Sequence, residues 1–416
     1  MVHAVGLYMK KVAVIGGGAA GLMAAYSAAI NGNAVTLFEK NEKCGKKIYI
    51  TGKGRCNVTH DCQPEEFLEN VVSNPKFLTG AIYAFPPSKC VNFFENGGLK
   101  LKLERGGRYF PVSDKASDVT KCLENYCKNA GVSFKFFETV EEIKVLHSTM
   151  FDIITSREHY GFDFVIVSTG GISYPTTGST GDGYNFAKSV GHKVIDLRPG
   201  LCGINLKGDF FKDLQGLSLK NIKLSVFSGA KIVKKFFGEM LFTHYGVSGP
   251  VVLSSSSLIN KTDLKNVKLS IDFKPALSDE QLDKRLLRDF ESLKNKSLYN
   301  CLKELLPVAV IPEILKRSGI GRDVQVNSVT KTQRRALLTT VKNFDMMVAS
   351  LRGFSEAIIT CGGIDVKEIN PKTMESKLVK GLYFCGEVLD LDAFTGGYNL
   401  QIAFSTGYAA GNSIKD

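Results

Sequence analysis

A glycine-rich turn close to the start of the chain has residue types and a spacing that can bind phosphate groups. Three glycines follow the GxGxxG pattern, at Gly16, Gly18 and Gly21. In this pattern the first glycine permits a tight turn, the second lets the backbone approach a pyrophosphate, and the third lets a helix pack closely on the preceding strand. A helix that begins at Ala19 and Ala20 would direct its unpaired N–H groups and the positive end of its dipole at the phosphates.

The elements expected around this turn support the same interpretation. An apolar strand is expected over residues 12–15, a small-residue helix over 19–30, and a second strand over 34–39 that ends in Glu39. At this spacing a carboxylate accepts hydrogen bonds from the ribose hydroxyls of an adenosine. Because strand, glycines, helix, second strand and acid occur in order, the pattern predicts a dinucleotide site rather than a turn that binds nothing.

A segment near the C-terminus distinguishes between the dinucleotides. An apolar run over residues 381–385 returns to the same expected sheet and ends in Gly386 and Glu387. A turn that leads into an apolar helix follows, formed by Gly396, Gly397, Tyr398 and Asn399. The glycine fingerprint alone leaves NAD open, whereas this second segment indicates FAD, which we expect to be bound non-covalently.

The order of strand-like and helix-like patterns along the sequence predicts an α/β fold with a Rossmann-like FAD domain that is interrupted by an insertion. Strand and helix patterns alternate up to residue 192, and a buried-type strand over 162–167 ends in a Thr169-Gly170 turn suited to lie beneath a flavin nucleotide. Inside the insertion, a helix is expected to start at Ser278. The expected division is a first FAD-binding part at 9–192, a β-rich domain at 193–275, a helical domain at 276–340, a β-rich return at 341–356 and a second FAD-binding part at 357–416.

The composition is that of a globular protein of two or three domains. The chain has 416 residues, of which 44% are hydrophobic and 23% charged, and no apolar run reaches the roughly 18–20 residues that span a bilayer. Its ten cysteines include no CxxC pair and no cluster with zinc spacing, so we expect neither a metal nor a disulfide framework. Without a signal-peptide pattern, a cytoplasmic location is expected. Residues 1–8 look like an extension without a role.

Basic residues are concentrated in two segments of a chain whose net charge is +12. Residues 40–55, which include Lys40 and Lys47, hold six Lys or Arg against one Glu, and part of this charge is expected to neutralise FAD phosphates. Residues 193–235 hold nine Lys or Arg against three Asp. A basic surface of this kind attracts polyanions. The alternative is a solvated face in a lysine-rich protein.

Five motifs carry a resemblance to a known family: residues 50–59, 108–117, 177–184, 242–250 and 396–401. Together they resemble the bacterial NAD(P)/FAD-dependent oxidoreductases that include bile-acid enone reductases and ribosomal RNA dihydrouridine synthases. The resemblance extends from residue 11 to the C-terminus. It implies a two-dinucleotide-binding flavoprotein fold with an inserted β-barrel-like domain and a small helical domain.

The resemblance also implies roles for individual residues. Glu387 would bind the ribityl chain or the pyrophosphate, and the Gly396-Gly397 backbone would lie against the isoalloxazine ring. The helix from Tyr398 onward would direct its N-terminus at the N1/C2 edge of the flavin, where it stabilises the anionic reduced ring. Further cofactor contacts are expected at Gly52, Gly54, Arg55, Asn57 and Val140.

The implied chemistry is hydride transfer from flavin N5 to a carbon–carbon double bond that is conjugated to a carbonyl, with a general acid that protonates the neighbouring carbon. Cys56 is the first candidate acid, because a thiol with an ordinary pKa of about 8.5 is mostly protonated at pH 7. The alternative is that Cys56 packs beneath the flavin. His244 and Tyr245, in a turn-like segment of the insertion, are the next candidates.

Three functions remain open from the sequence. The basic segment favours reduction of uridine to dihydrouridine in ribosomal RNA or its precursor. The alternatives are reduction of a small enone, such as a steroid or bile-acid-like compound, and a flavin-binding regulator without turnover. No second GxGxxG turn follows a strand, so we expect NAD(P)H to bind transiently as the reductant.

Overall fold

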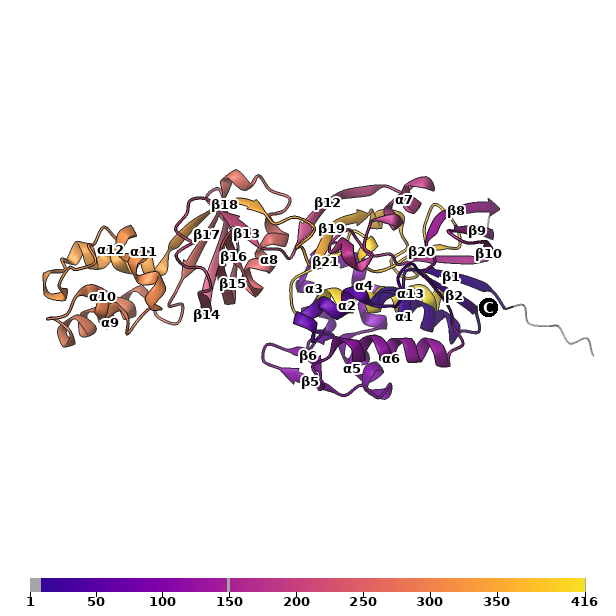
Figure 1. Cartoon of the computed structure of the whole chain (residues 1–416), viewed down its shortest axis with the longest axis horizontal. Coiled ribbons are helices and arrows are strands. Elements are labelled where there is room, and N and C mark those ends of the chain that lie inside the picture. The colour runs from indigo at the N-terminus through magenta and orange to yellow at the C-terminus, as the bar shows by residue number, and fades with distance from the viewer. Residues whose placement is uncertain (1–8, 148–149, 416) are drawn as a thin grey trace, which may run out of the picture. The chain divides into compact units, whose positions relative to one another are not determined.

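A computed structural model describes residues 9–147 and 150–415, so the expected N-terminal extension at 1–8 lies outside the described residues. The chain divides into two compact units (Figure 1). We call them the discontinuous unit, Met1–Pro199 together with Phe354–Asp416, and the inserted unit, Gly200–Gly353. The finer five-part division of the sequence stays a prediction.

The centre of the discontinuous unit is a five-stranded parallel sheet, and its order confirms the expected Rossmann-like fold. The strands run in the order β20-β11-β1-β2-β7. The C-terminal return therefore pairs directly with the strand that precedes the Thr169-Gly170 turn. Buried apolar side chains fill β1 after its first residue, as expected for a central parallel strand. The bounds are β1 (Lys11–Ile15), β2 (Ala34–Glu39), β7 (Ser133–Phe136), β11 (Phe164–Val167) and β20 (Leu382–Phe384).

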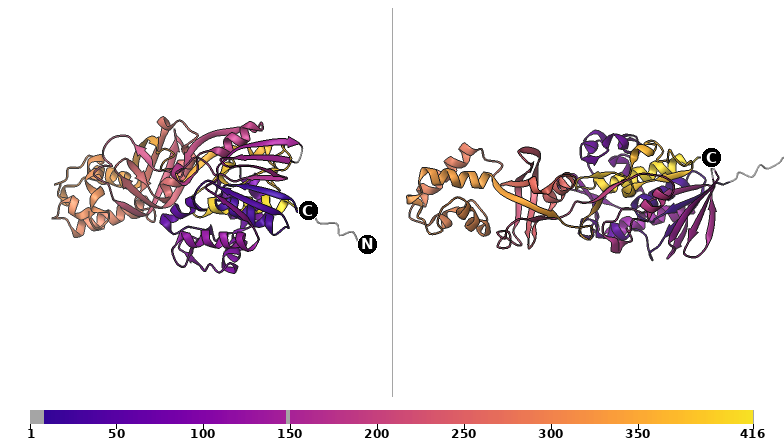
Figure 2. Two further views of the ribbon diagram at one scale, coloured as in Figure 1. Left: turned by 45° about the vertical axis from the view of Figure 1, so that its right-hand side comes forward. Right: turned by 90° about the horizontal axis from the view of Figure 1, so that it is seen from above.

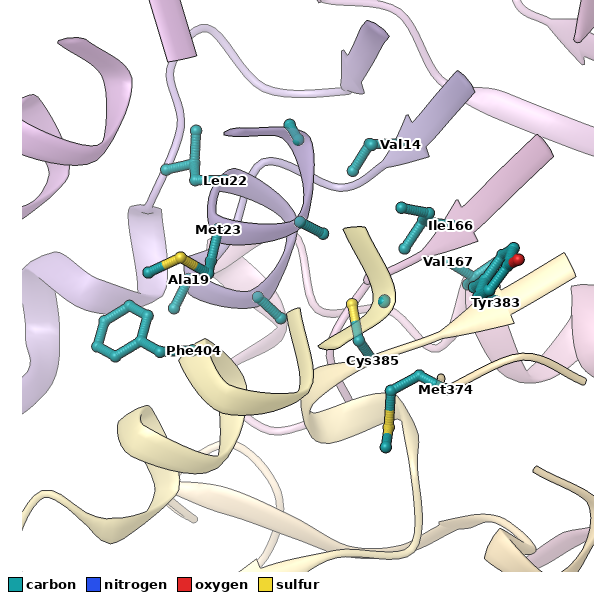
Figure 3. Close-up of a cluster of buried hydrophobic side chains, with 14 of the residues drawn as sticks. Val14, Ala19, Leu22, Met23, Ile166, Val167, Met374, Tyr383, Cys385 and Phe404 are labelled. Atoms are coloured by element: carbon teal, nitrogen blue, oxygen red, sulfur yellow. The ribbon is translucent and has the colours of Figure 1, made fainter. Parts of the chain in front are cut away.

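Two helices from opposite ends of the chain pack closely beside this sheet, α1 (Ala19–Ala29) and α13 (Tyr398–Ser413). Two glycines of α13 permit the close approach. A Cβ atom added at Gly407 or Gly411 would lie 2.3 Å from a backbone oxygen of α1. Figure 3 shows the buried core around them, to which β1, α1, β11, β20 and α13 all contribute.

Smaller elements complete the discontinuous unit (Figure 2). Two strand pairs, β4 with β21 and β12 with β19, join its N-terminal and C-terminal parts. The remaining sheets are β3-β6-β5 and β10-β9-β8. The strands are β3 (Thr59–His60), β4 (Val71–Ser73), β5 (Leu101–Glu104), β6 (Arg108–Pro111), β8 (Val140–His147), β9 (Met150–Thr155), β10 (His159–Phe162), β12 (Val194–Gly200), β19 (Ile359–Ile364) and β21 (Asp392–Ala393). The helices are α2 (Lys46–Ile50), α3 (Pro64–Glu69), α4 (Pro75–Ala84), α5 (Pro87–Asn96), α6 (Ala116–Asn129) and α7 (Asp182–Ser189).

The inserted unit contains a closed barrel, as the family resemblance implied. Its strands close in the order β13-β16-β15-β14-β17-β18. The helix expected at Ser278 begins there, where a capping box pairs that residue with Gln281. The strands are β13 (Ile204–Leu206), β14 (Ser218–Ser228), β15 (Lys231–Thr243), β16 (Gly246–Ser248), β17 (Val267–Asp272) and β18 (Phe344–Leu351). The helices are α8 (Pro250–Ile259), α9 (Asp279–Ser292), α10 (Leu298–Leu302), α11 (Ile311–Arg317) and α12 (Lys331–Lys342).

A buried histidine should make the discontinuous unit sensitive to acid. The side chain of His192 is 0% exposed and forms hydrogen bonds with Glu368 at 3.0 Å and Ser376 at 2.8 Å. Burial lowers the pKa of this imidazole, although the hydrogen bond to Glu368 opposes the shift. In the unfolded chain this imidazole has its ordinary pKa of about 6.5, so the unfolded chain binds more protons. Stability should therefore fall as the pH drops below that value.

Thermal unfolding between pH 5 and 8 should show a smaller acid-induced loss of stability for His192→Gln than for the wild type. The exposed His159→Gln serves as the control, and equal acid losses in all three proteins would contradict the prediction.

Candidate functional site

A cleft in the discontinuous unit brings together many of the residues expected to bind a dinucleotide. Its empty space, counted out to the open solvent, is about 1280 Å³. The glycine-rich turn, the end of β2, α2, the loop after β11 and the start of α13 line it. The predicted cofactor residues in this lining are Gly16, Gly18, Ala19, Ala20, Glu39, Lys40, Lys47, Val140, Thr169, Gly170, Glu387 and Asn399.

The three glycines of the turn each have the geometry that the pattern predicts. Gly16 has a φ of +101°, and a Cβ atom there would lie 2.8 Å from the carbonyl oxygen of Ser168. A Cβ atom at Gly21 would lie 1.9 Å from the carbonyl oxygen of Gly16, so only glycine permits this strand–helix packing. Gly18 instead faces open space, with no atom within 4 Å of an added Cβ. The turn therefore leaves room for a phosphate beside Gly18 and at the N-terminus of α1.

Glu39 is held in place by two backbone N–H groups. Its Oε2 accepts a hydrogen bond from the N–H of Gly17 at 2.9 Å, and its Oε1 accepts one from the N–H of Asn41 at 2.8 Å. The residue is buried, with 9% of its surface exposed. A carboxylate fixed in this way at the end of β2 is preorganised to accept further hydrogen bonds from ribose hydroxyls.

Two lysines of the lining are already paired with carboxylates. Lys40 forms an ion pair with Asp182 at 2.7 Å, and Lys47 forms one with Glu387 at 2.8 Å. Glu387 also accepts a hydrogen bond from the N–H of Thr360 at 2.8 Å. The positive charge available for phosphates is therefore smaller than the sequence suggested. The Lys47–Glu387 pair joins α2 to the C-terminal segment instead, at the short helix η7 (Gly386–Val388).

One unpaired polar atom and two other features of the cleft lining show whether the residues present fit FAD. The hydroxyl oxygen of Thr169 is buried, lines the cleft and has no hydrogen-bond partner among the described residues. Such an atom is costly unless a ligand or water satisfies it. With the open space at Gly18 and the fixed carboxylate of Glu39, the lining matches a dinucleotide along its length. The residues fit FAD, and when bound it would supply a hydride from its reduced ring.

The other C-terminal residues predicted to contact the cofactor lie outside this lining. Gly386 lies against α1, where an added Cβ would approach that of Ala20 to 2.7 Å. The Gly396-Gly397 turn packs on β3, and an added Cβ at Gly397 would lie 2.6 Å from the backbone of Thr59. These glycines therefore serve close packing of the C-terminal segment. Their contact with the ring of FAD stays a prediction.

A histidine that the sequence patterns did not identify lies beside this turn. His60 stacks on Tyr398, with ring centroids 4.7 Å apart, and its Nδ1 lies 3.1 Å from the carbonyl oxygen of Gly396. It directly follows the motif at residues 50–59 and is one of six histidines in the chain. Its position in sequence next to that motif was the signal that could have identified it.

The motif at 50–59 forms a short helix, η1 (Thr51–Gly54), and an ion-pair network next to it. Gly52 and Gly54 both have positive φ angles, of +56° and +85°. Arg55 pairs with Glu104 and Asp114 and lies over the ring of Phe110, 4.2 Å from its centroid. Lys102 and then Arg55 hold the pKa of Asp114 below its usual range.

Asn57 lies beside this network, outside the cleft lining. Its side-chain oxygen is buried and has no hydrogen-bond partner in the described part of the chain. A cofactor role for Asn57 and for the motif before it stays a prediction.

The three candidate proton donors are divided between the two units, with Cys56 in the discontinuous unit and both His244 and Tyr245 in the inserted unit. Cys56 is fully buried in the discontinuous unit with a φ of +61°, outside the lining of the cleft, and burial raises the pKa of its thiol to about 12. His244 is exposed in the inserted unit. Tyr245 lies beneath Arg352, whose guanidinium carbon is 4.5 Å from the ring centroid. The roles of all three stay predictions.

Metal-binding clusters and membrane-spanning helices are both absent from the described residues. No group of three or more His, Cys, Asp or Glu side chains within 9–147 and 150–415 could hold a metal ion. Over the same residues, no helix has both the length and the apolar character needed to cross a membrane.

Comparison with known proteins places the chain in a family. The HI0933-like protein Rossmann domain family matches residues 10–413. A 3-dehydro-bile acid delta(4,6)-reductase from Clostridium scindens is 32% identical over 98% of this chain and 100% of that protein. A ribosomal RNA dihydrouridine synthase from Haemophilus influenzae is 30% identical over 97% of this chain and 98% of that protein.

A solved structure shows the same fold. The 3-ketosteroid-delta4-(5alpha)-dehydrogenase from Rhodococcus jostii matches 99% of this chain and 98% of its own with a TM-score of 0.53, at 14% identity. The chain thus belongs to the HI0933-like Rossmann family and is an FAD-dependent oxidoreductase.

Proposed function

We propose that this oxidoreductase reduces uridine to dihydrouridine in ribosomal RNA. The observation that favours RNA is the basic segment at 193–235, because Lys207, Lys220 and Lys231 from it are exposed on the inserted unit. A small apolar enone needs no such surface, whereas a polyanion is attracted by it through counterion release and the long-range field. The full-length similarity to a ribosomal RNA dihydrouridine synthase supports the same substrate.

The reaction requires a double bond polarised by a conjugated carbonyl. In uridine the C5=C6 bond is conjugated to the C4 carbonyl, so hydride adds at C6 and a proton at C5. The product gains two hydrogens, and NAD(P)H is the proposed source of the two electrons. In this scheme Glu39 would hold the ribose of the cofactor and the turn at Gly16 and Gly18 would hold its phosphates. Cys56, buried outside the cleft lining in this structure, would have to reach the substrate to donate the proton.

Reduction of a small enone is the second candidate. The similarity to a 3-dehydro-bile acid reductase covers the whole of that relative and is of the same degree. A steroid enone has the same conjugated C=C–C=O unit as uridine, so the cofactor and the proton donor would serve both reactions without change. The two candidates differ only in what the protein binds next to the flavin.

Mass spectrometry of digested ribosomal RNA tests the proposal. In RNA from cells without the gene, one uridine should lack the two-dalton mass increase of dihydrouridine. The wild-type gene should restore that increase. Purified enzyme with NAD(P)H should then produce dihydrouridine in RNA from the deleted cells. An unchanged dihydrouridine content in that RNA, together with no product in vitro, would exclude the RNA substrate and favour the small enone.

A further inference from the structure

A long hairpin of the barrel displays both basic and aromatic side chains on its outer surface. Strands β14 and β15 pair along most of their length, from Ser218 opposite Leu241 to Ser228 opposite Lys231. Alternate residues of a strand point to opposite faces of the sheet. Exposed residues on these strands include Lys220, Lys231, Ile232, Val233, Lys235 and Phe237, which we call the hairpin surface, and also the acidic Glu239, two residues beyond Phe237 on the same strand.

The lysines of the hairpin surface have no acidic partners. Within residues 9–147 and 150–415, no carboxylate lies at ion-pair distance from Lys220, Lys231 or Lys235. The neighbouring Lys223 differs, because it lies 3.3 Å from the buried Asp272. Three unpaired ammonium groups against the one exposed carboxylate of Glu239 leave this hairpin with a net positive potential, which salt screens.

Phe237 makes this surface unusual. Its side chain is 65% exposed, the largest exposed fraction among the large hydrophobic residues that the structure describes. It lies directly opposite Lys223 in the strand register and two residues from Lys235. Leaving a phenyl ring in water forfeits on the order of 1–2 kcal/mol of burial, so an exposed ring between cations indicates a ligand with both apolar faces and negative charge.

Protection of a strand edge is the alternative explanation for the lysines. Strand β15 pairs with β16 only through residues 241–243 among those described, which leaves its first part as an edge that lysine could blunt. Such protection does not account for exposed Phe237, Ile232 and Val233 on the same strand, because apolar side chains promote the association that lysines prevent. The combination is instead typical of surfaces that bind single-stranded nucleic acid, where bases stack on aromatic rings and cations contact phosphates.

We infer that the hairpin surface binds an unpaired segment of the RNA substrate. Lys220 and Lys231, at opposite ends of the hairpin, and Lys235 between them contact separate phosphates along the strand, and Phe237 stacks on one exposed base. An unpaired segment is required because a base inside an RNA helix is already stacked and paired, and only a splayed base can stack on the ring of Phe237. The inference rests on the proposed function and assigns the RNA contact to a part of the protein without cofactor residues.

RNA binding by two variants tests the inference. The probe is a ribosomal RNA fragment, transcribed in vitro, that contains the uridine modified by the wild type. Lys220→Gln/Lys231→Gln/Lys235→Gln should lower the slope of log K against log salt by about 2, since each contact to a single strand contributes about 0.7. Phe237→Ala should weaken binding about 5- to 150-fold at every salt concentration and leave the slope unchanged. Reduction of the bound flavin by NAD(P)H should stay at the wild-type rate in both variants.

A matched variant and two further outcomes make the test decisive. Lys284→Gln/Lys316→Gln/Lys331→Gln removes the same charge from exposed lysines of α9, α11 and α12 and should keep the wild-type slope. If the wild type modifies RNA while the hairpin variants bind it with the wild-type slope and affinity, the inference is wrong and the proposed function stands. If the wild type binds vesicles of phosphatidylserine through these lysines but neither binds nor modifies the RNA, both are wrong.

Discussion

Cys56→Ala is expected to reduce dihydrouridine formation by about 10²- to 10⁴-fold, the usual contribution of a positioned general acid. Burial raises the pKa of this thiol to about 12, so the proton that it would donate is retained at neutral pH. Flavin reduction by NAD(P)H needs no such donor and should remain at the wild-type rate. Stopped-flow absorbance of the flavin and mass spectrometry of the product measure the two half-reactions separately.

The pH profile provides an independent readout of the same role. A donor must be protonated, so activity falls as the pH rises through its pKa. With an ordinary thiol the loss would begin near pH 8.5, whereas the raised pKa of Cys56 moves the loss well above pH 10. Turnover without the half-loss that an ordinary thiol would show near pH 8.5 is therefore expected.

A packing role for Cys56 makes the opposite predictions. It requires Cys56→Ala to lower the melting temperature and FAD content while product formation per bound FAD is unchanged. Cys90→Ala is the matched control, because Cys90 is a fully buried thiol in the same core. Equal, small effects of the two substitutions on product formation would exclude Cys56 as the donor.

Glu39→Ala is expected to weaken FAD binding about 10- to 150-fold. A hydrogen bond to a charged group contributes about 1.5–3 kcal/mol, and the ribose hydroxyls would lose their charged acceptor. The substitution also removes the acceptor for the buried N–H of Gly17, which loosens the phosphate turn. FAD retained after desalting, and the Kd from flavin fluorescence titration, measure the effect.

A neighbouring carboxylate provides the control for this prediction. Glu42 lies on the same loop with 48% of its side chain exposed and pairs with Lys46 at 2.9 Å. Glu42→Ala should bind FAD with the wild-type Kd. A Glu39→Ala protein that retains FAD after desalting with the Kd of the Glu42→Ala protein would show that the carboxylate at the end of β2 does not hold the ribose.

Local patterns predicted the parts of the fold whose physics is local. The three glycines of the phosphate turn could be assigned from spacing, because each serves a backbone approach that no other residue permits. The start of α9 at Ser278 could be assigned as well, since a capping box forms between residues three apart. The return of the C-terminal segment to the sheet was also predicted, from its apolar run and the glycines after it.

Contacts between distant residues were beyond these patterns. Lys47 pairs with Glu387, 340 residues later, so the charge that the sequence assigned to phosphates is largely neutralised within the protein. His60 stacks on Tyr398, and the burial of Cys56 depends on a core that residues from both ends of the chain form. Nothing in the spacing of neighbouring residues encodes such pairs.

The sequence by itself determined the class of cofactor and the architecture that holds it, because glycine spacing, strand period and helix caps act within a few residues. The tertiary structure decided which charges are paired, which thiol is buried and which ring is exposed. Phe237 illustrates the difference: in the sequence it is the second residue of a Phe-Phe pair that could be buried, and only the folded barrel leaves it 65% exposed near the unpaired Lys235. The exposure of a side chain and its ion pairs depend on which distant residues pack around it, and the fold determines those residues.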